Sequence, residues 1–574
     1  MRRSALLATA SLAAIAGALA IPVQDVGCGQ TAHYVAIQAF AHGIANVDSH
    51  AGETCDLVRD GGHYYAAKAP ALDVWALPWY ALLHSVGAVP NNPNAAARYP
   101  KAMLSVPVRA LWEMGLWAVV LPALLLLLVL RRTADRLEPG VGIAAAAILG
   151  LGTLVLPFST LLFSHVAAAL LAFLSFALLF DRDAGRVRLI AAGAAAGLAV
   201  STDLPLAVPA LLLAGYAAAR TPHARRLLLF SVGGLAGLLP LLAFDWWAFG
   251  SPFHLAYSHA AINPGPYGVE QTPAHTFFTL GVPHVRLAVQ LLLGGRGLLI
   301  LTPVLAAAGA GVAILWRQRL RAEATLIAAL CIVEVTWNAG RPNYPLALGG
   351  WVPGPRLLIP LLPFLCFALA PVLRRAPATV GALAAVSIGA MALATSAGPL
   401  LPDDNTRHWL SRLVDGNLVQ TVFSFAGAGH GVGPMLPFYT LVLIGAAAAA
   451  TAPRFQTSRR DLVTASAALG AWVLVEHGAP RLFVVDAAVH KSWGLAAAAV
   501  LAVNLAWAVG RTHAHGARAT IVAAPLLAFA TVRFTDHAKW ALALCVLVLA
   551  ALALVTFGHR DARLAAVLEA AGLR

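Results

Sequence analysis

Residues 61–70, GGHYYAAKAP, place a lysine close behind a run of carboxylates. Asp48 and Asp56 precede Lys68 in this polar segment, and Asp25 lies further upstream. A carboxylate at a membrane surface is a candidate general base, and a lysine beside it can hold an anionic phosphate as a point charge. The alternative is a solvated loop whose charges do no chemistry. The neighbours that would contact a bound lipid or sugar are His63, Tyr64 and Tyr65.

A second candidate site lies at residues 343–365, NYPLALGGWVPGPRLLIPLLPFL. Its glycines and prolines predict an irregular loop that carries Trp351, a candidate substrate contact, and ends at Arg356, where an apolar helix is expected to begin. An arginine at that depth is costly unless paired, so it is a functional candidate, and its fork suits two phosphate oxygens. An arginine that reaches lipid headgroups, or that pairs with a buried acid such as Glu334, is the alternative.

His165, in LLFSHVAAA, is a weaker candidate for substrate binding, because a packing role is the simpler interpretation at the mouth of two helices. Asp203, Asp245 and Glu334 are acids at membrane depth for which the sequence indicates no partner. The chain has no HExxH or paired CxxC spacing typical of a metal site, and no GxSxG nucleophile elbow. We therefore predict no metal ligand among the site residues.

The elements that must position these residues follow from composition. The chain has 574 residues, of which 60% are hydrophobic and only 11% charged, with a mean hydropathy of +0.77. These values exclude a soluble globular protein with a polar surface and indicate an integral membrane protein. The formal net charge of +14 fits a polytopic protein with basic cytoplasmic loops and requires no nucleic acid.

Apolar stretches long enough to span a membrane recur about sixteen times. We expect an all-α polytopic fold, with a core of about 11 to 12 transmembrane helices in residues 1–400 and a C-terminal helical bundle in residues 401–574. Interfacial helices are expected in the first long connection, residues 23–106, where aromatic and apolar residues interleave. The apolar stretches fall at residues 4–22, 107–130, 139–157, 163–180, 189–202, 204–219, 227–247, 298–316, 322–338, 356–373, 377–397, 435–452, 461–479, 493–510, 519–533 and 539–557.

Every second connection between these stretches is basic, beginning with Arg2 and Arg3. The positive-inside bias then places both termini in the cytoplasm and the long connections, including 23–106, on the outer side. Lys68 lies on that side against the bias, so it calls for a local reason. The stretch 4–22 can also be read as a cleavable signal peptide, but the many spans that follow favour a first transmembrane helix.

Cys28 and Cys55 both lie in the first outer connection, while the other cysteines lie in apolar stretches. A bridge between these two is allowed in an extracytoplasmic compartment, and two unpaired thiols are the alternative. The sequence leaves both open.

Several motifs, in their order along the chain, resemble one known family. They are the outer loop with its acids, YYxxKAP, LFSH before the fourth stretch, FGSPF at residues 249–253, and GGWxxGPR. Together they resemble the polytopic glycosyltransferases of the GT-C superfamily, in the branch of protein O-mannosyltransferases and lipid A aminoarabinose transferases. The similarity covers residues 1–400.

The resemblance implies a bacterial inner-membrane enzyme with its active site facing the periplasm or cell exterior. Such an enzyme moves a sugar from a polyprenyl-phosphate-linked donor to a glycan, lipid or protein acceptor, with inversion at the sugar. In the family an aspartate of the first outer loop activates the acceptor hydroxyl, while a lysine and an arginine face the donor phosphate. Lys68 and Arg356 are the residues of this sequence that match these last two roles.

The chain departs from the family pattern at one point. Related sequences place an Asp-Glu pair shortly after the first helix, where this chain has Gln30 and Thr31. Glutamine cannot act as a base. We therefore expect the catalytic aspartate elsewhere, with Asp48 first, then Asp56, and Asp25 behind them.

Two other functions stay open. The many spans, with Arg356 and Asp203, also suit a transporter or flippase for a lipid-linked or anionic solute, although the sequence shows no convincing internal repeat. The acid missing at Gln30 also suits a non-catalytic protein that binds polyprenyl lipid. No cofactor is certain, and a divalent cation held loosely near His50 and Glu53 is the one that stays open.

Overall fold

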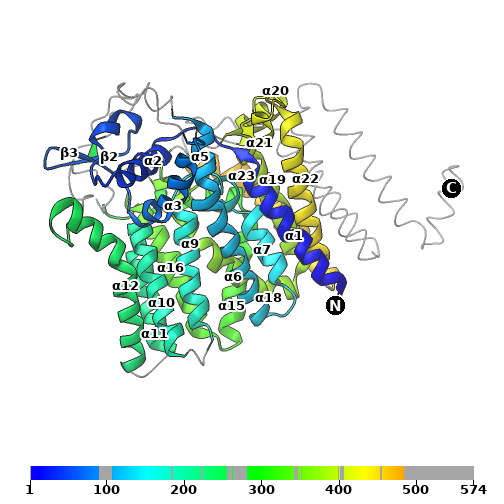
Figure 1. The fold of residues 1–574 in the computed structure, drawn as a ribbon. Coiled ribbons are helices and arrows are strands. Elements are labelled where there is room, and N and C mark those ends of the chain that lie inside the picture. The colour runs from blue at the N-terminus through cyan, green and yellow to red at the C-terminus, as the bar shows by residue number, and fades with distance from the viewer. Residues whose placement is uncertain are drawn as a thin grey trace, which may run out of the picture.

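The computed structural model describes residues 2–89, 106–181, 185–220, 224–254, 261–262, 281–341, 347–350, 352–398, 400, 406–452 and 455–483. The helices form a bundle, and the first outer segment gathers at one end of it (Figure 1). By length and composition, six helices in the described residues can cross a membrane, or seven if one bent pair is a single span. Shorter apolar helices accompany them. The chain is a mostly helical, multi-pass membrane protein, as the sequence predicts.

Each apolar stretch predicted between residues 4 and 479 coincides with helix. The stretch at 298–316 belongs to a pair, Val285–Leu301 and Pro303–Arg317, that is bent by 107°. The predicted stretches after residue 483 lie outside the described residues. The helices are α1 (Arg2–Ala20), α6 (Leu121–Leu137), α7 (Gly142–Leu151), α8 (Val155–Phe158), α9 (His165–Leu179), α10 (Arg186–Thr202), α11 (Ala207–Arg220), α12 (Ala224–Phe249), α13 (Val285–Leu293), α14 (Leu298–Leu301), α15 (Ala307–Arg317), α16 (Arg321–Ala339), α18 (Leu362–Arg375), α19 (Pro377–Ala397), α22 (Val432–Thr451) and α23 (Arg459–Phe483).

An aromatic core holds α9 against α18. Phe173 meets Phe364 edge to face with ring centroids 5.2 Å apart, and Phe176 meets Phe367 at the same separation. All four rings are buried, so each contributes a large apolar area as well as ring–ring contacts. Because α9 also packs on η7 (Arg356–Leu361), the short helix that leads into α18, this core brings the first residues of α9 and η7 to one level of the bundle.

Helices α10 and α12 approach each other unusually closely, which fixes the end of α10. A Cβ atom at Gly193 would lie 1.9 Å from the carbonyl oxygen of Phe230, and one at Gly197 would lie 2.1 Å from that of Gly234. Only glycine permits backbones to meet at this distance. The segment after α10, which carries Asp203, is therefore held firmly beside α9.

The first outer segment contains helices and a small β-hairpin, and the sequence analysis does not predict the hairpin. Strand β2 pairs with β3 antiparallel, and β4 joins the other edge of β2. Gly61 and Gly62 form the two-residue turn, and both have positive φ (55° and 89°), which glycine adopts without a steric cost. The elements of this segment are α2 (Cys28–Ala41), η1 (Asp48–Glu53), β2 (Leu57–Asp60), β3 (His63–Ala66) and α3 (Ala71–Ser85). Strand β4 (Ala261–Ile262) comes from a later connection, and α5 (Val108–Gly115) and η2 (Leu116–Val120) begin the candidate span that continues into α6.

Helix α3 has the character of the predicted interfacial helices. Trp75 and Leu82 are exposed on its surface. The Trp75 ring stacks on that of Trp117, with centroids 5.1 Å apart. Amphipathic tryptophan rings on an exposed apolar helix are typical of segments that lie in the membrane interface.

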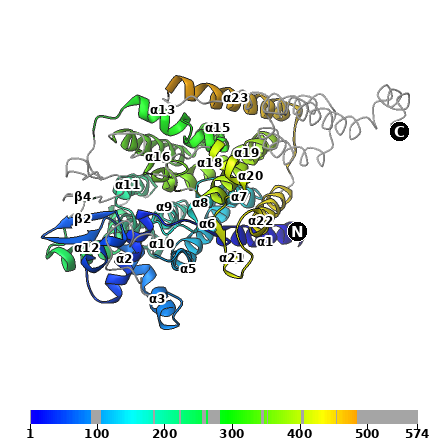
Figure 2. The same ribbon diagram turned by 90° about the horizontal axis from the view of Figure 1, so that it is seen from above.

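The part of the chain after residue 400 packs onto the part before it. Strand β1 (Pro22–Val23) pairs with β5 (Gln420–Thr421), and α1 lies along α22 (Figures 1 and 2). Helix α23 packs on α19, where the Asp461 carboxylate accepts hydrogen bonds from the amide groups of Ala378 and Thr379. The division of the chain at residue 400 stays a prediction. The remaining short elements are η3 (Leu204–Leu206), η6 (Pro303–Ala306), α20 (Thr406–Asp415) and α21 (Val422–Phe425).

Candidate functional site

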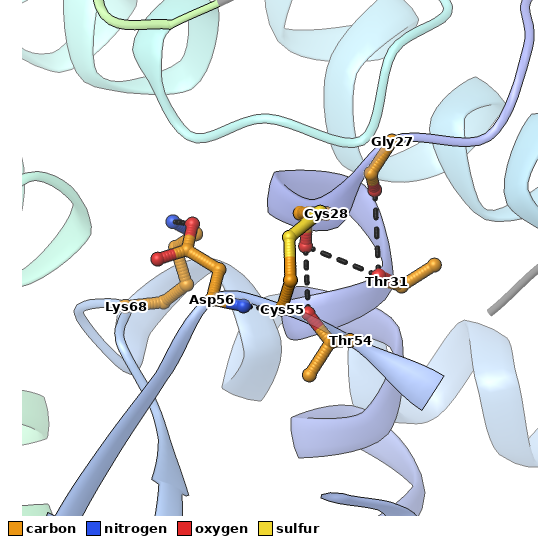
Figure 3. Close-up of a disulfide and its surroundings, with 7 residues drawn as sticks. All are labelled: Gly27, Cys28, Thr31, Thr54, Cys55, Asp56 and Lys68. Atoms are coloured by element: carbon orange, nitrogen blue, oxygen red, sulfur yellow. Dashed lines mark hydrogen bonds and ion pairs between the residues drawn. A yellow bond between two sulfur atoms is a disulfide. The ribbon is translucent and has the colours of Figure 1, made fainter. Parts of the chain in front are cut away.

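The β-hairpin brings Asp56 and Lys68 together. Asp56 immediately precedes β2 and Lys68 follows β3, so antiparallel pairing places both at the open end of the hairpin. The Lys68 Nζ donates to Asp56 Oδ2, forming an ion pair (Figure 3). The exposed fraction is 15% for the Lys68 side chain and 32% for that of Asp56. The pair is thus partly shielded from water, which strengthens its interaction with nearby charges.

Arg356 lies at the start of η7, where the irregular loop enters the bundle. Its guanidinium carbon lies 4.7 Å above the centroid of the Phe163 ring, a cation–π contact. Its Nε atom is buried and has no hydrogen-bond partner among the described residues. The acids whose charges act on this guanidinium are Asp56 and Asp203. The guanidinium is therefore held on an aromatic ring inside the protein, with its Nε donor available to a ligand.

The glycine-rich loop before Arg356 is shaped by contact with that arginine. Gly349 has a φ of 94°, and a Cβ atom there would lie 2.7 Å from both Cγ and Nε of Arg356. Gly350 has a similar φ of 103° but open space around it. Glycine at position 349 thus meets two requirements, a left-handed backbone and a close approach to the arginine side chain.

His165 and Asp203 form a buried pair beside Arg356. The Nδ1 of His165 lies 2.5 Å from Asp203 Oδ2, and the imidazole stacks on the Phe163 ring with centroids 6.0 Å apart. The positive charges that reach the imidazole are those of Arg356 and Lys68. Phe163 therefore contacts two polar groups, the His165 imidazole and the Arg356 guanidinium.

Arg341, just beyond α16, is a further member of this cluster, and the sequence analysis missed it. Burial lowers the pKa of its guanidinium to about 10; Arg356 acts in the same direction, while Asp203 and Glu334 oppose it. The signal that could have found Arg341 is its position at membrane depth, directly after a span, where an arginine is costly without acidic neighbours. Its neighbours Asp203 and Glu334 were noted from the sequence but left without a partner.

Asp48, the first-ranked base, lies in a different setting. Its Oδ2 is 2.6 Å from His63 Nδ1, and its Oδ1 accepts a hydrogen bond of 2.6 Å from the backbone amide of Tyr64. The side chains of Asp48 and His63 are 40% and 55% exposed. Within the described residues, no hydrogen bond or ion pair joins Asp48 to Lys68 or Arg356. Tyr65 packs on Phe249, with ring centroids 4.7 Å apart.

Asp25 lies near the end of α19, on the far side of Gln30. A Cβ atom at Gly398 would lie 3.1 Å from Asp25 Oδ2 and 3.3 Å from Arg412 Nη1. Gln30 donates through Nε2 to the Asp25 carbonyl (2.7 Å) and accepts through Oε1 from the Leu162 amide (3.2 Å). The glutamine thus ties the start of α2 to the loop before α9. Trp351 lies outside the described residues.

Cys28 and Cys55 form a disulfide bridge. The bridge joins the first residue of α2 to the residue before Asp56 (Figure 3). Of the two states that the sequence leaves open, the structure has the bridged one.

A second buried pair, which the sequence analysis did not identify, joins α2 to α3. His33 Nδ1 lies 2.6 Å from Asp73 Oδ1, and both side chains are almost fully buried. Burial raises the pKa of Asp73, while His33 and Lys68 oppose that rise. The pair therefore borders the hairpin site and links it to the interfacial helix.

A metal centre has no clear candidate in the part of the chain that the structure describes. No group of three or more His, Cys, Asp or Glu side chains there could hold a metal ion. His50 pairs instead with Glu53, at 2.7 Å between Nδ1 and Oε1.

No protein-family model and no curated protein matches the sequence. The chain is similar to two solved structures of ArnT from Cupriavidus metallidurans. The apo structure shares 14% identity, with a TM-score of 0.43 over 95% of this chain and 77% of that chain. The structure bound to undecaprenyl phosphate shares 13% identity, with a TM-score of 0.45 over 94% and 76%. At these TM-scores the likeness carries no argument about the site.

Proposed function

We propose that the chain is a membrane glycosyltransferase that moves a sugar from a polyprenyl-phosphate-linked donor to an acceptor on the extracytoplasmic side. One observation carries the proposal: a chain of contacts links Lys68 to Arg356, from segments almost 300 residues apart. Lys68 pairs with Asp56, the neighbouring Cys55 is bridged to α2, and α2 touches the Phe163 ring on which the Arg356 guanidinium lies. Two cations of different geometry beside an acid suit a phosphate that gathers negative charge as it leaves a sugar.

The ion pair of the hairpin is the resting state of the proposed site. A donor phosphate competes with Asp56 for the Lys68 ammonium, and Arg356 offers its planar fork to the remaining phosphate oxygens. Binding of the donor therefore frees the Asp56 carboxylate at the moment a base is needed. The site lies between the outer segment and the bundle, where a low dielectric makes each of these charges more effective than in water.

The proposed reaction is a single displacement. The acceptor oxygen attacks the anomeric carbon, the bond from that carbon to the phosphate oxygen breaks, and the phosphate leaves with the electron pair. Asp56 takes the proton of the acceptor hydroxyl, while Lys68 and Arg356 stabilise the phosphate charge. Attack opposite the leaving group inverts the sugar. His63, Tyr64, Tyr65, His165 and Trp351 remain the proposed contacts of donor and acceptor.

The contacts favour Asp56 over Asp48 as the base. Asp56 pairs with the partly buried lysine, whereas both oxygens of Asp48 are engaged by His63 and the Tyr64 amide. The proposal therefore ranks Asp56 first, Asp48 second and Asp25 third. The proposed location is a bacterial inner membrane with both termini cytoplasmic, because the basic connections then lie inside.

Turnover by the purified protein tests the function. The protein, reconstituted in vesicles with a synthetic polyprenyl-phosphate-linked sugar and with water as the substitute acceptor, should release polyprenyl phosphate and free sugar. Lys68→Ala should lower the rate about 10²- to 10³-fold. Arg59→Ala is the matched control, since Arg59 is an exposed cation of the same hairpin that lies over the Tyr64 ring. Equal rates for Lys68→Ala and Arg59→Ala would remove the phosphate role of Lys68.

A second candidate is a transporter or flippase for a lipid-linked or anionic solute. The bent pair Val285–Leu301 and Pro303–Arg317 favours it, because transporters build substrate sites from interrupted spans. Movement of the lipid between leaflets without loss of its sugar would support this candidate, and binding without movement or turnover would indicate a non-catalytic lipid-binding protein.

A further inference from the structure

The Cys28–Cys55 disulfide connects the two parts of the proposed phosphate site, which are the Asp56–Lys68 pair and Arg356. On one side, Cys55 directly precedes Asp56, the ion-pair partner of Lys68 (Figure 3). The connection is reinforced by Thr54, whose hydroxyl donates to the Cys28 carbonyl (2.9 Å) and accepts from the Asp56 amide (3.2 Å). The backbone on both sides of Cys55 is therefore tied to the first residue of α2.

On the other side, α2 contacts Phe163, the ring on which Arg356 lies. A Cβ atom at Gly29 would lie 2.3 Å from Cε1 of Phe163, so the helix backbone touches this ring. The same ring also contacts the Arg356 guanidinium, whose carbon lies 4.7 Å from the ring centroid. Gln30 adds a hydrogen bond to the Leu162 amide. The start of α2 is thus fixed against the residues that support Arg356.

We propose that the Cys28–Cys55 disulfide is a positioning element that sets the placement of the Asp56–Lys68 pair relative to Arg356. This inference rests on the proposed function, because it concerns how two cations share one phosphate. The hairpin strands are only four residues long, so their own pairing gives little rigidity against the bundle. A covalent link from α2 supplies the rigidity that a two-cation site needs, since small displacements of bound groups cost large factors in rate.

The disulfide also limits the compartment in which the site works. Disulfides persist outside the cytoplasm and are reduced within it. A site that depends on the bridge is competent only after the first outer segment has crossed the membrane and been oxidised. The hairpin without the bridge keeps Asp56 and Lys68 paired but leaves the pair free to move away from Arg356.

The test measures the affinity of the full-length protein, in nanodiscs, for polyprenyl phosphate. The Cys28→Ser/Cys55→Ser variant should bind about tenfold more weakly than the wild type. Reduction of the folded wild-type protein should produce the same loss and should have no effect on the variant. This second arm keeps the test informative if the serine variant folds poorly.

A double-mutant cycle separates positioning from general stabilisation. If the bridge acts by placing Lys68, its removal should weaken binding by less than twofold in a Lys68→Ala background; a merely structural bridge would cause the same tenfold loss in both backgrounds. Unchanged affinity after reduction would overturn the inference while leaving the proposed function intact. Normal binding and turnover by Lys68→Ala alone would instead remove the proposed function.

Discussion

Two side-chain pairs, each with a carboxylate, lie at the two ends of the hairpin, and their surroundings differ. Asp48 and His63 pair at the turn end, where both side chains are well exposed. Asp56 and Lys68 pair at the open end, where both side chains are partly buried. Each pair holds a carboxylate, but only the second adjoins a covalent link to α2, the helix that touches Phe163 beside Arg356.

The difference shows how a charge pair becomes a candidate site. An exposed pair contributes little, because water screens its charges and the side chains must be ordered to meet. A partly buried pair with a second cation nearby is different, because a lower dielectric strengthens the attraction of both cations for an anionic ligand. Chemistry is therefore expected at the open end of the hairpin, and a supporting role at its turn.

The largest expected effect comes from replacing Asp56 by asparagine, and the same replacement at Asp48 serves as the comparison. Asp56→Asn should lower turnover about 10²- to 10⁴-fold, because it removes the proposed base while keeping the side-chain shape. Asp48→Asn is the matched variant and should lower turnover at most about fivefold, the scale of an exposed pair. Initial rates of polyprenyl phosphate release measure both. The reverse order of effects would restore Asp48 as the base.

A smaller effect is expected when Arg356 is replaced by lysine, which keeps the positive charge but lacks the planar guanidinium. Arg356→Lys should lower turnover about 10²-fold, because lysine lacks the planar fork and its contact with the Phe163 ring is weaker. The loss should fall on the rate at saturating donor as well as on KM, since the phosphate charge grows in the transition state. Steady-state kinetics separate the two. A variant with wild-type kcat would place Arg356 outside the reaction.

The smallest effect separates backbone strain from displacement of the arginine. Gly349→Ala and Gly350→Ala both force a left-handed alanine, at a cost of about 1–2 kcal/mol of stability each. Only the alanine at 349 also meets Arg356, so turnover should fall about tenfold there and stay near wild type at 350. Thermal unfolding and turnover of the two variants make the comparison. Equal turnover losses would show that the loop, not the arginine, is what matters.

The sequence predicted the helices well, because twenty or so apolar residues leave a membrane segment few alternatives to helix. In the described residues only six or seven of these helices are long and apolar enough to cross a membrane, fewer than the spans predicted there. The sequence did not predict the hairpin, whose four-residue strands are shorter than the apolar runs that mark a strand. The Gly61-Gly62 turn was the available signal, since two glycines between short runs of β-branched and aromatic residues are typical of a tight hairpin.

The sequence indicated several single residues of the candidate site but did not indicate which of them contact one another. Lys68 was notable because it lies on the outer side, against the positive-inside bias, and Arg356 because it lies where an apolar helix begins. The pairing of Asp56 with Lys68, and of Asp203 with His165, depends on strand register and helix packing, which bring together residues 12 and 38 positions apart. Arg341 lacked any local motif. No pattern in one sequence distinguishes Asp48 from Asp56 before these contacts are known.

The measurement that tests the central idea most directly is a double-mutant cycle on polyprenyl phosphate binding with Lys68→Ala, Arg356→Ala and the combined variant. If both cations hold one phosphate, the two losses should not add, and the coupling should lie at about 0.5–3 kcal/mol. Losses that add within error would mean that the ammonium and the guanidinium serve separate sites, which contradicts the account.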